Sequence, residues 1–259
     1  MTRPRSVPPG LYDAELLSAF AGGEYEAFLA AGGAPLRPRL DRALELAAIR
    51  PHATVVDVGC GRGEASVHAA LRGARVVALD YSPDALALTA RTAGAVAGVA
   101  SRGAIHRVAC AADALPLADE SADRVLLLDV VEHLHPWQLA AALGEIRRIL
   151  RPGAHVVIHT LPNRWALAAA YPLLRRLSRG LPREPRSSYE RLVHVNEQSP
   201  RSLRAALRAA GLEARVWVEE WTTEHASRAT SRSFPDALRE RGYPVLRRPI
   251  VRRIAALAM

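Results

Sequence analysis

A glycine-rich loop that begins with an acidic residue is the feature of this 259-residue chain best suited to chemistry. The loop, DVGCGRG at residues 57–63, follows an apolar run and precedes a helix-like segment. Its alternate glycines let the backbone turn sharply and approach a ligand closely. A dinucleotide-binding loop would place a third glycine where Glu64 stands. The Asp57 carboxylate suits a cationic ligand better than a pyrophosphate.

Two further aspartates follow the next two apolar runs, and with Asp57 they predict a nucleoside pocket. Asp80 ends the second run, where an acid can accept hydrogen bonds from both ribose hydroxyls. Asp113 follows the third run, where a carboxylate can accept from an adenine amino group. S-adenosylmethionine (SAM) is a nucleoside that carries an ammonium and a sulfonium, so it matches this order of acids; three turn-capping aspartates are the alternative. We expect the cofactor SAM to contact Asp57, Gly59, Cys60, Gly61, Asp80, Tyr81, Ala112, Asp113, Ala114 and Asp129.

The elements that would position these residues alternate in type along the chain. Short β-rich runs cover residues 54–58, 75–80, 105–110, 124–129 and 155–159, and helix-like segments cover 63–71, 83–99 and 136–150. Strands that alternate with helices indicate a parallel sheet with helices on both faces. We therefore expect an α/β fold with a doubly wound, mostly parallel, Rossmann-like sheet whose ligands bind at the carboxyl ends of the strands.

The chain outside this alternation divides into a lead, a cap and a tail. Residues 1–35 are expected to form a flexible lead and a helix, and residues 36–220 the SAM-binding domain. Within that domain residues 161–198, rich in proline and arginine, are expected to form a cap inserted after the fifth strand. Residues 221–259 form a basic tail. The pattern also predicts helices at 11–30, 36–50 and 200–210 and a strand at 212–218.

With these motifs the chain resembles the class I SAM-dependent methyltransferases, in the broad group that methylates small molecules. The resemblance covers about residues 36–220. It rests on DVGCGRG, VVALDYS (residues 76–82), ADALPL (residues 112–117) and VVEHL (residues 130–134). It implies a seven-stranded sheet whose final strand is antiparallel. The sequence departs from that pattern because no seventh strand is evident after Val218.

Two segments, residues 129–136 after the fourth strand and residues 192–197 near the end of the cap, are together similar to a metal-binding pattern. Two related groups have this pattern, the ubiquinone-pathway O-methyltransferases and the small-RNA 2′-O-methyltransferases. This similarity implies that Asp129, Glu132, His133 and His194 hold a divalent ion, which would lower the pKa of an attacking hydroxyl. Mixed oxygen and imidazole ligands favour manganese, iron, cobalt or zinc over magnesium. Two alternatives stay open: His133 or His194 acts as a general base without a metal, or these residues have structural roles.

Composition indicates the compartment and the kind of partner. The net charge of +9 favours an anionic acceptor, nucleic acid or an acidic membrane surface, although a solvated arginine-rich surface is the alternative. Two cysteines and no long apolar run predict a cytoplasmic protein. Residues 171–181 and 245–257 could contact a membrane surface. In the cap, Trp165, Tyr171 and Tyr189 could line an acceptor pocket, and Arg164, Arg175, Arg176, Arg183 and Arg186 could bind an anion.

These features predict an enzyme that transfers the methyl group of SAM to a small-molecule acceptor, with a hydroxyl expected, by in-line displacement. Because the sulfonium is already reactive, the protein mainly supplies position and proton removal. The alternatives are a SAM-binding enzyme with other chemistry, an RNA 2′-O-methyltransferase, a non-catalytic scaffold and an NAD(P) enzyme. No RNA-binding module is recognisable and DNA is not an expected partner. The sequence does not indicate an oligomeric state.

Overall fold

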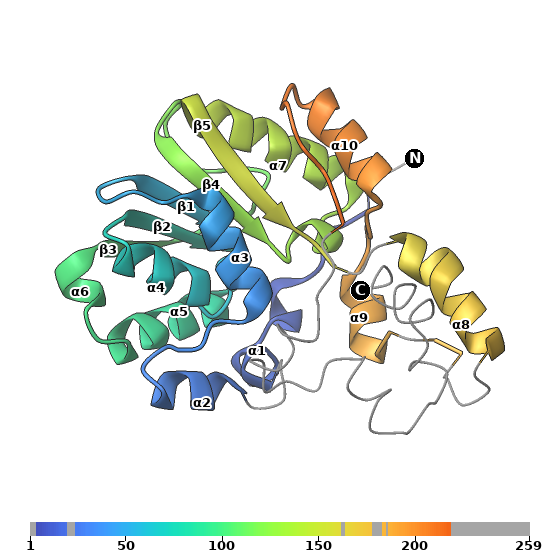
Figure 1. Ribbon diagram of the computed structural model, residues 1–259, viewed down its shortest axis with the longest axis horizontal. Coiled ribbons are helices and arrows are strands. Elements are labelled where there is room, and N and C mark those ends of the chain that lie inside the picture. Colours follow the sequence, from blue (N-terminus) through green and yellow to red (C-terminus); the bar gives the residue numbers. More distant parts are fainter. Residues whose placement is uncertain (1–3, 20–23, 162–163, 178–182, 185, 219–259) are drawn as a thin grey trace.

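A parallel β-sheet forms the centre of the computed structural model, which describes residues 4–19, 24–161, 164–177, 183–184 and 186–218 (Figure 1). Its five strands lie in the order β3-β2-β1-β4-β5, and every neighbouring pair is parallel. They are β1 (Thr54–Val58), β2 (Arg75–Asp80), β3 (Ala104–Ala109), β4 (Ala122–Leu128) and β5 (Leu150–His159). The predicted α/β fold with a parallel sheet is therefore confirmed.

Helices cover both faces of this sheet because successive strand residues point to opposite sides. Val55 and Leu126 pack into a buried cluster with side chains of α3 (Pro38–Ala47) and α4 (Glu64–Leu71). Val56 and Leu127, one residue further along, pack into the opposite cluster with α7 (Pro136–Ile149) and α10 (Pro200–Ala209). The remaining helices around the sheet are α5 (Pro83–Ala95) and α6 (Val99–Arg102). The sheet is doubly wound, as predicted.

The path of the chain across the sheet reverses at β1. The chain first runs outward from β1 to β2 and β3, then crosses back to β4 and β5 on the other side. In open α/β sheets a crevice forms at such a switch point, outside the carboxyl ends of the strands. The strand order therefore places the ligand site between the ends of β1 and β4.

The N-terminal segment does not match the expected flexible lead. It comprises η1 (Pro9–Leu11), α1 (Ala14–Ala19) and α2 (Glu24–Ala30), so the helix predicted at 11–30 is two helices. Val7 is buried, and its carbonyl oxygen accepts a hydrogen bond from the Tyr81 hydroxyl at 3.2 Å. Tyr25 on α2 is also buried and donates to the carbonyl oxygen of Leu88 on α5. These contacts attach the lead to the sheet domain.

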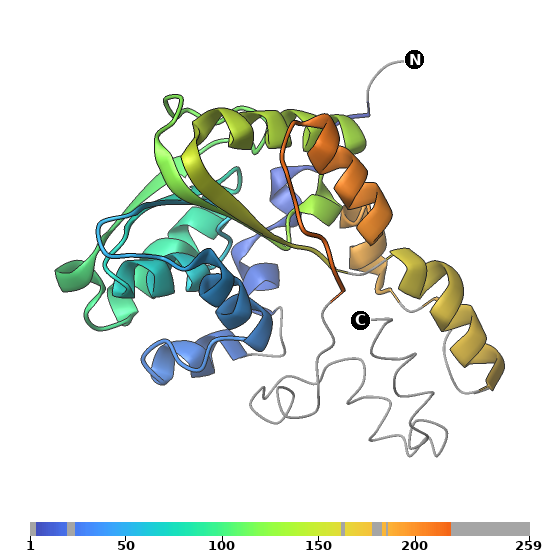
Figure 2. The same ribbon diagram turned by 45° about the horizontal axis from the view of Figure 1, so that its top comes forward.

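The segment predicted as a cap, residues 161–198, contains short helical elements beyond the end of β5. They are η3 (Ala166–Ala170, a π-helical turn), α8 (Tyr171–Leu177) and α9 (Ser188–Val193). In both views α8 projects away from the sheet, whereas α9 lies closer to its edge (Figures 1 and 2). Among the described residues, no helix combines the length and the apolar character that a membrane crossing requires. The tail at 221–259 lies outside the described residues.

Two further elements of the structure differ from the sequence-based prediction. The segment 83–99 is broken into α5 and α6, because the backbone is extended at Val96 and has a positive φ of 84° at Gly98. Residues 212–218 do not form the predicted strand. Leu212 and Val216 pack against the buried cluster under α7, but the carbonyl oxygen of Val216 accepts from the Arg204 side chain. Side-chain burial there is not accompanied by strand pairing.

Candidate active site

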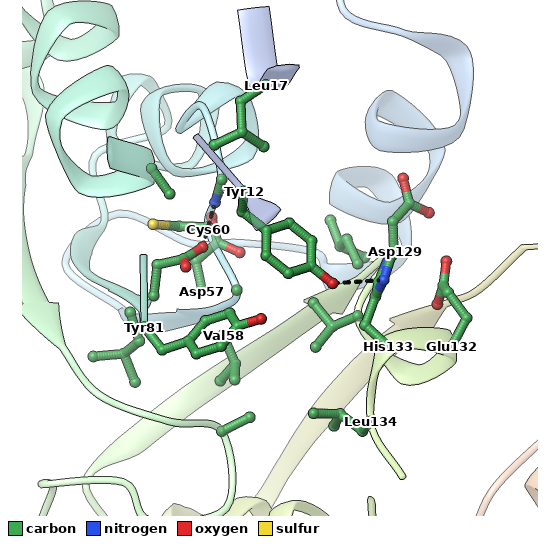
Figure 3. Close-up of a pocket in the computed structure, with 18 of the residues that line it drawn as sticks. Tyr12, Leu17, Asp57, Val58, Cys60, Tyr81, Asp129, Glu132, His133 and Leu134 are labelled. Atoms are coloured by element: carbon green, nitrogen blue, oxygen red, sulfur yellow. Dashed lines mark hydrogen bonds between the residues drawn. The ribbon is translucent and has the colours of Figure 1, made fainter. Parts of the chain in front are cut away.

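A cavity of about 650 Å³ lies at the carboxyl ends of β1, β2 and β4, where the switch point predicts a site. Its volume is in the range of small-molecule sites. The glycine loop after β1 and the turn after β4 both line it. In Figure 3, Asp57, Cys60 and Tyr81 lie on one side of the Tyr12 ring, and Asp129, Glu132 and His133 lie on the other. We call these the loop side and the turn side.

Asp80 organises the loop side. One carboxylate oxygen accepts from the backbone N–H of Gly61 at 3.0 Å, and the other accepts from the N–H of Ser82 at 2.9 Å. Burial raises the pKa of this carboxyl above its ordinary value. Because each carboxylate oxygen retains a second lone pair, Asp80 can hold the loop and still accept hydrogen bonds from a ligand.

Asp57 lies deeper, at the end of β1. It is 2% exposed, and the Ser66 hydroxyl donates to one carboxylate oxygen at 2.6 Å. Burial, together with the charge of Asp80, raises the pKa of Asp57 to about 6. A cation in the cavity would favour the ionised form of both carboxyl groups. The loop side is therefore electrostatically suited to a positively charged ligand.

Most residues predicted to bind the cofactor line this cavity. They are Asp57, Gly59, Cys60, Gly61, Asp80, Tyr81, Ala112 and Asp129. Asp113 and Ala114 are not among the residues that line it. The contact of Asp113 with an adenine ring therefore stays a prediction.

Asp129 begins the turn side but is engaged by neighbours on other elements. One of its carboxylate oxygens is 2.8 Å from the Arg39 guanidinium, and the other contacts Nδ1 of His159. Burial alone would raise the pKa of Asp129, but these two partners hold it well below its ordinary value. The backbone at Asp129 has a φ of 58°, a conformation that aspartate tolerates better than most residues.

Glu132, His133 and His194 come together on the turn side. Each offers one possible ligand atom, and these atoms lie within 4.8 Å of one another. The two imidazole rings meet edge-on, with their centroids 4.9 Å apart. Asp129 is not part of this group, and its carboxylate is paired with Arg39 and His159. The structure thus brings together three of the four residues predicted to bind a metal.

The protonation chemistry of these three side chains follows from burial. Burial, with Asp129 nearby, raises the pKa of Glu132 to about 8, and Thr160 and the N–H of Leu161 donate to its oxygens. Burial, and secondarily His194, lowers the pKa of His133 to about 4; burial also lowers that of His194. Both imidazoles are therefore neutral near pH 7, as a general base or a metal ligand must be.

Comparison with known proteins decides the family. Residues 56–158 match the model of a methyltransferase domain. A demethylmenaquinone methyltransferase from Mycobacterium sp. (strain KMS) is 33% identical over 67% of this chain and 70% of its own length. The chain belongs to the class I SAM-dependent methyltransferases.

Two further likenesses agree with this assignment. A ubiquinone biosynthesis O-methyltransferase from Rhizobium etli is 34% identical over 61% of this chain; the match covers 59% of that protein, under two thirds of its length. A crystal structure of a SAM-dependent methyltransferase from Aquifex aeolicus has a TM-score of 0.55 and 16% identity, covering 80% of this chain and 92% of that one. This last similarity concerns the fold.

Several residues that line the cavity of this methyltransferase were not predicted from the sequence. Arg37 and Arg39 flank the start of α3, and Tyr12 reaches the cavity from the N-terminal segment. Gln138 and Glu190 are further examples. Arg37 pairs with Glu64 at 2.6 Å, while its buried Nε has no hydrogen-bond partner among the described residues. The one sequence signal for the arginines is their position at the start of the predicted helix that precedes β1. Tyr12 has no motif around it.

The cap residues proposed to bind the acceptor have different environments. Trp165 is 54% exposed, and Tyr171 is buried; neither lines the cavity. Tyr189 donates a hydrogen bond from its hydroxyl to the carbonyl oxygen of Leu11 at 2.9 Å. Arg186 pairs with Glu184 and Glu197. The role of the remaining cap arginines in binding an anion stays a prediction.

Proposed function

We propose that this protein binds SAM on the loop side of the cavity and transfers its methyl group to a hydroxyl of a small-molecule acceptor on the turn side. The observation that carries the proposal is the division of one cavity into two chemically different halves. Two carboxyl groups line one half, Asp57 and Asp80. Two neutral imidazoles and Glu132 line the other.

The loop side supports SAM in particular because the charges of the cavity can match those of the cofactor. Asp57 and Asp80 can attract its cationic groups and accept hydrogen bonds from its ribose. The carboxylate of SAM needs a cation, and Arg37 lines the same cavity with a buried Nε that has no partner in the described part of the chain. A buried donor without a partner is costly, so a ligand that accepts from it gains affinity.

The chemistry on the turn side is proton removal from the acceptor. The acceptor oxygen attacks the methyl carbon, the carbon–sulfur bond breaks, and its electron pair stays on sulfur as S-adenosylhomocysteine. The hydroxyl proton must leave the acceptor. A neutral imidazole of His133 or His194 can take it, which is a contribution of roughly 10²–10⁴-fold for a well-placed base.

A divalent ion is a second way to remove the same proton, and the residues present partly fit one. Glu132, His133 and His194 would hold it, and the buried Nδ1 of His194 has no hydrogen-bond partner among the described residues. When bound, such an ion lowers the pKa of a coordinated hydroxyl. Asp129 would not be a ligand without giving up its contacts with Arg39 and His159.

The test is transfer of label from SAM that carries a tritiated methyl group. A catechol, a naphthohydroquinone and total RNA serve as acceptors, with protein prepared with and without prior chelator treatment. We expect label in a small hydroxylated acceptor, and a fall of about 100-fold or more for the variant that lacks the base. His133→Gln and His194→Gln are the variants to compare.

Chelation separates the two routes. Loss of activity that manganese or zinc restores would support the metal, whereas unchanged activity would support a protein base. Consumption of SAM without any methylated product would contradict methyl transfer. Label that enters RNA alone would contradict a small-molecule acceptor.

A further inference from the structure

Tyr12 lies at the boundary between the two halves of the cavity, far in sequence from the residues it touches. Its ring centroid is 5.7 Å from that of Tyr81 on the loop side and 5.6 Å from that of His133 on the turn side. A third aromatic ring, that of Tyr189, lies edge-on at 6.5 Å. In Figure 3 the Tyr12 side chain reaches into the cavity, and its hydroxyl points at His133.

The N-terminal strap, defined as residues 6–12, holds Tyr12 in this position. Three hydroxyl groups donate to its backbone carbonyl oxygens, two from consecutive residues after β2 and one from α9. Ser82 donates to Tyr12 at 2.8 Å, Tyr189 to Leu11 at 2.9 Å and Tyr81 to Val7 at 3.2 Å. The Gln138 amide also donates to the Ser6 hydroxyl at 3.0 Å. The strap is thus attached to both the loop side and the turn side.

The contact between Tyr12 and His133 involves a specific ring nitrogen. Nδ1 of His133 lies 2.9 Å from the Tyr12 hydroxyl and 3.2 Å from the carbonyl oxygen of Val193. A carbonyl oxygen can only accept, so both contacts are satisfied together when Nδ1 carries the proton and donates to the two oxygens. In that tautomer Nε2 of His133 is unprotonated. A histidine that uses one nitrogen in chemistry is commonly fixed through the other.

We infer that Tyr12 is a positioning residue for the proposed methyl transfer. Together with the Val193 carbonyl, its hydroxyl holds the His133 ring through Nδ1, so that the ring presents an unprotonated Nε2 to the acceptor. The inference rests on the proposed function, since it assigns which nitrogen serves the acceptor. It adds a residue on the N-terminal strap to a site otherwise built from the strand ends and α9.

Nuclear magnetic resonance of the ring nitrogens tests the contact without any acceptor. The full chain is labelled with ¹⁵N-histidine, and the signals of His133 are assigned by their loss in His133→Gln. In the wild-type chain we expect a protonated Nδ1 and an unprotonated Nε2. Tyr12→Phe removes the shorter contact of Nδ1 and keeps the one to the Val193 carbonyl at 3.2 Å. We therefore expect the two shifts to move toward each other as the second tautomer becomes partly populated.

The control for this measurement is Tyr189→Phe, which removes the hydroxyl contact with Leu11 of the strap and keeps the contacts of His133 Nδ1 with Tyr12 and Val193. Its His133 signals should stay at the wild-type positions. Unchanged His133 signals in Tyr12→Phe would overturn the inference, whether or not a methyl acceptor has been found. Failure of the proposed function is a separate result, namely no transfer of label by the wild-type chain to catechol or naphthohydroquinone.

A double-mutant cycle measured by kinetics tests whether Tyr12 acts on methyl transfer through His133. With the catechol or naphthohydroquinone that accepts label, Tyr12→Phe should lower kcat roughly tenfold to 100-fold while leaving the KM for SAM within about threefold. In a His133→Gln background the same change should have no further effect on kcat, because Tyr12 acts through His133. An equal loss in both backgrounds would overturn the inference. So would a loss confined to KM.

Discussion

At the scale of single residues, this cavity depends on carboxyl groups that have a structural role and a proposed binding role. Asp80 holds Gly61 and Ser82 through their backbone N–H groups and still lines the cavity. Asp57 accepts from the Ser66 hydroxyl and also lines the cavity. Such double use explains why motif residues can be predicted from sequence: the loop needs them to fold, and the proposed ligand would bind to them.

Asp80→Asn should weaken binding of S-adenosylhomocysteine by about tenfold to 100-fold, because hydrogen bonds to a charged group contribute about 1.5–3 kcal/mol. Titration calorimetry measures the affinity. Asp113→Asn is the matched variant, since Asp113 is a predicted adenine contact that does not line the cavity. A smaller loss for Asp113→Asn is expected. An Asp80→Asn variant that binds like the wild type would contradict the ribose contact.

Binding of SAM should release protons at mildly acidic pH. The pKa of Asp57 is raised to about 6 in the cavity without ligand, so this carboxyl is largely protonated at pH 5 and ionised at pH 7. A cationic ligand favours the ionised form, so affinity should rise with pH up to about 6 and then level off. Calorimetry near pH 5.5 in buffers of different ionisation enthalpy measures the proton count.

The raised pKa of Asp57 also makes the stability of the unliganded protein depend on pH. A carboxyl whose folded pKa is raised contributes stability that is present at low pH and lost as the pH rises through about 6. Asp57→Asn should remove this dependence and reduce the proton release. Heats that do not vary between buffers for the wild type would show that Asp57 does not respond to the ligand.

At the scale of elements, the sheet and its helices were predictable because their patterns are local. The runs at 54–58 and 75–80 coincide with β1 and β2, and apolar runs buried on both faces mark the central strands. The strand predicted at 212–218 failed because pairing depends on a neighbouring strand, which the pattern of a segment does not contain. Tyr12 was missed for a similar reason: its partner His133 is 121 residues away.

The turn from β1 into α4 gives a matched test of two glycines. Both Gly61 and Gly63 have a positive φ, of 53° and 77°, which costs an alanine about 1–2 kcal/mol. At Gly63 an added Cβ would also come within 2.9 Å of the Thr89 backbone on α5, whereas at Gly61 it would meet nothing within 4 Å. Gly63→Ala should therefore lose more stability in chemical denaturation than Gly61→Ala.

Ligand binding should be weakened more by Gly61→Ala than by Gly63→Ala. Gly61 lines the cavity, so a side chain there enters the space of the ligand. Gly61→Ala should weaken binding of S-adenosylhomocysteine with a modest loss of stability. If Gly61→Ala proved the less stable of the two, the packing of α4 against α5 would not be what requires glycine at 63.

At the scale of the whole molecule, the N-terminal strap connects parts of the domain that the sheet alone keeps apart. Its contacts reach Ser82 before α5, Gln138 on α7 and Tyr189 on α9. Among residues 4–13, Val7 is the one buried apolar side chain, so the strap adds little to the core. Its hydrogen bonds add some stability, but its main contribution should be to ligand retention and not to the core.

Removal of residues 1–12 should separate these two roles. This truncation keeps Asp13, whose carboxylate accepts from the N–H of Leu16 at the start of α1. We expect the protein to stay folded with a lower melting temperature, because each of the anchoring hydrogen bonds lost contributes about 1 kcal/mol. About 1 kcal/mol moves the melting temperature by a few degrees in a chain of this size. We expect S-adenosylhomocysteine to dissociate roughly tenfold faster, since changes within one interface act mostly on dissociation. Removal of residues 1–5, which keeps Ser6 and its contact with Gln138, is the control and should change neither quantity. If the longer truncation unfolded the protein, the strap would belong to the folding core; if it left dissociation unchanged, the strap would not cover the bound ligand.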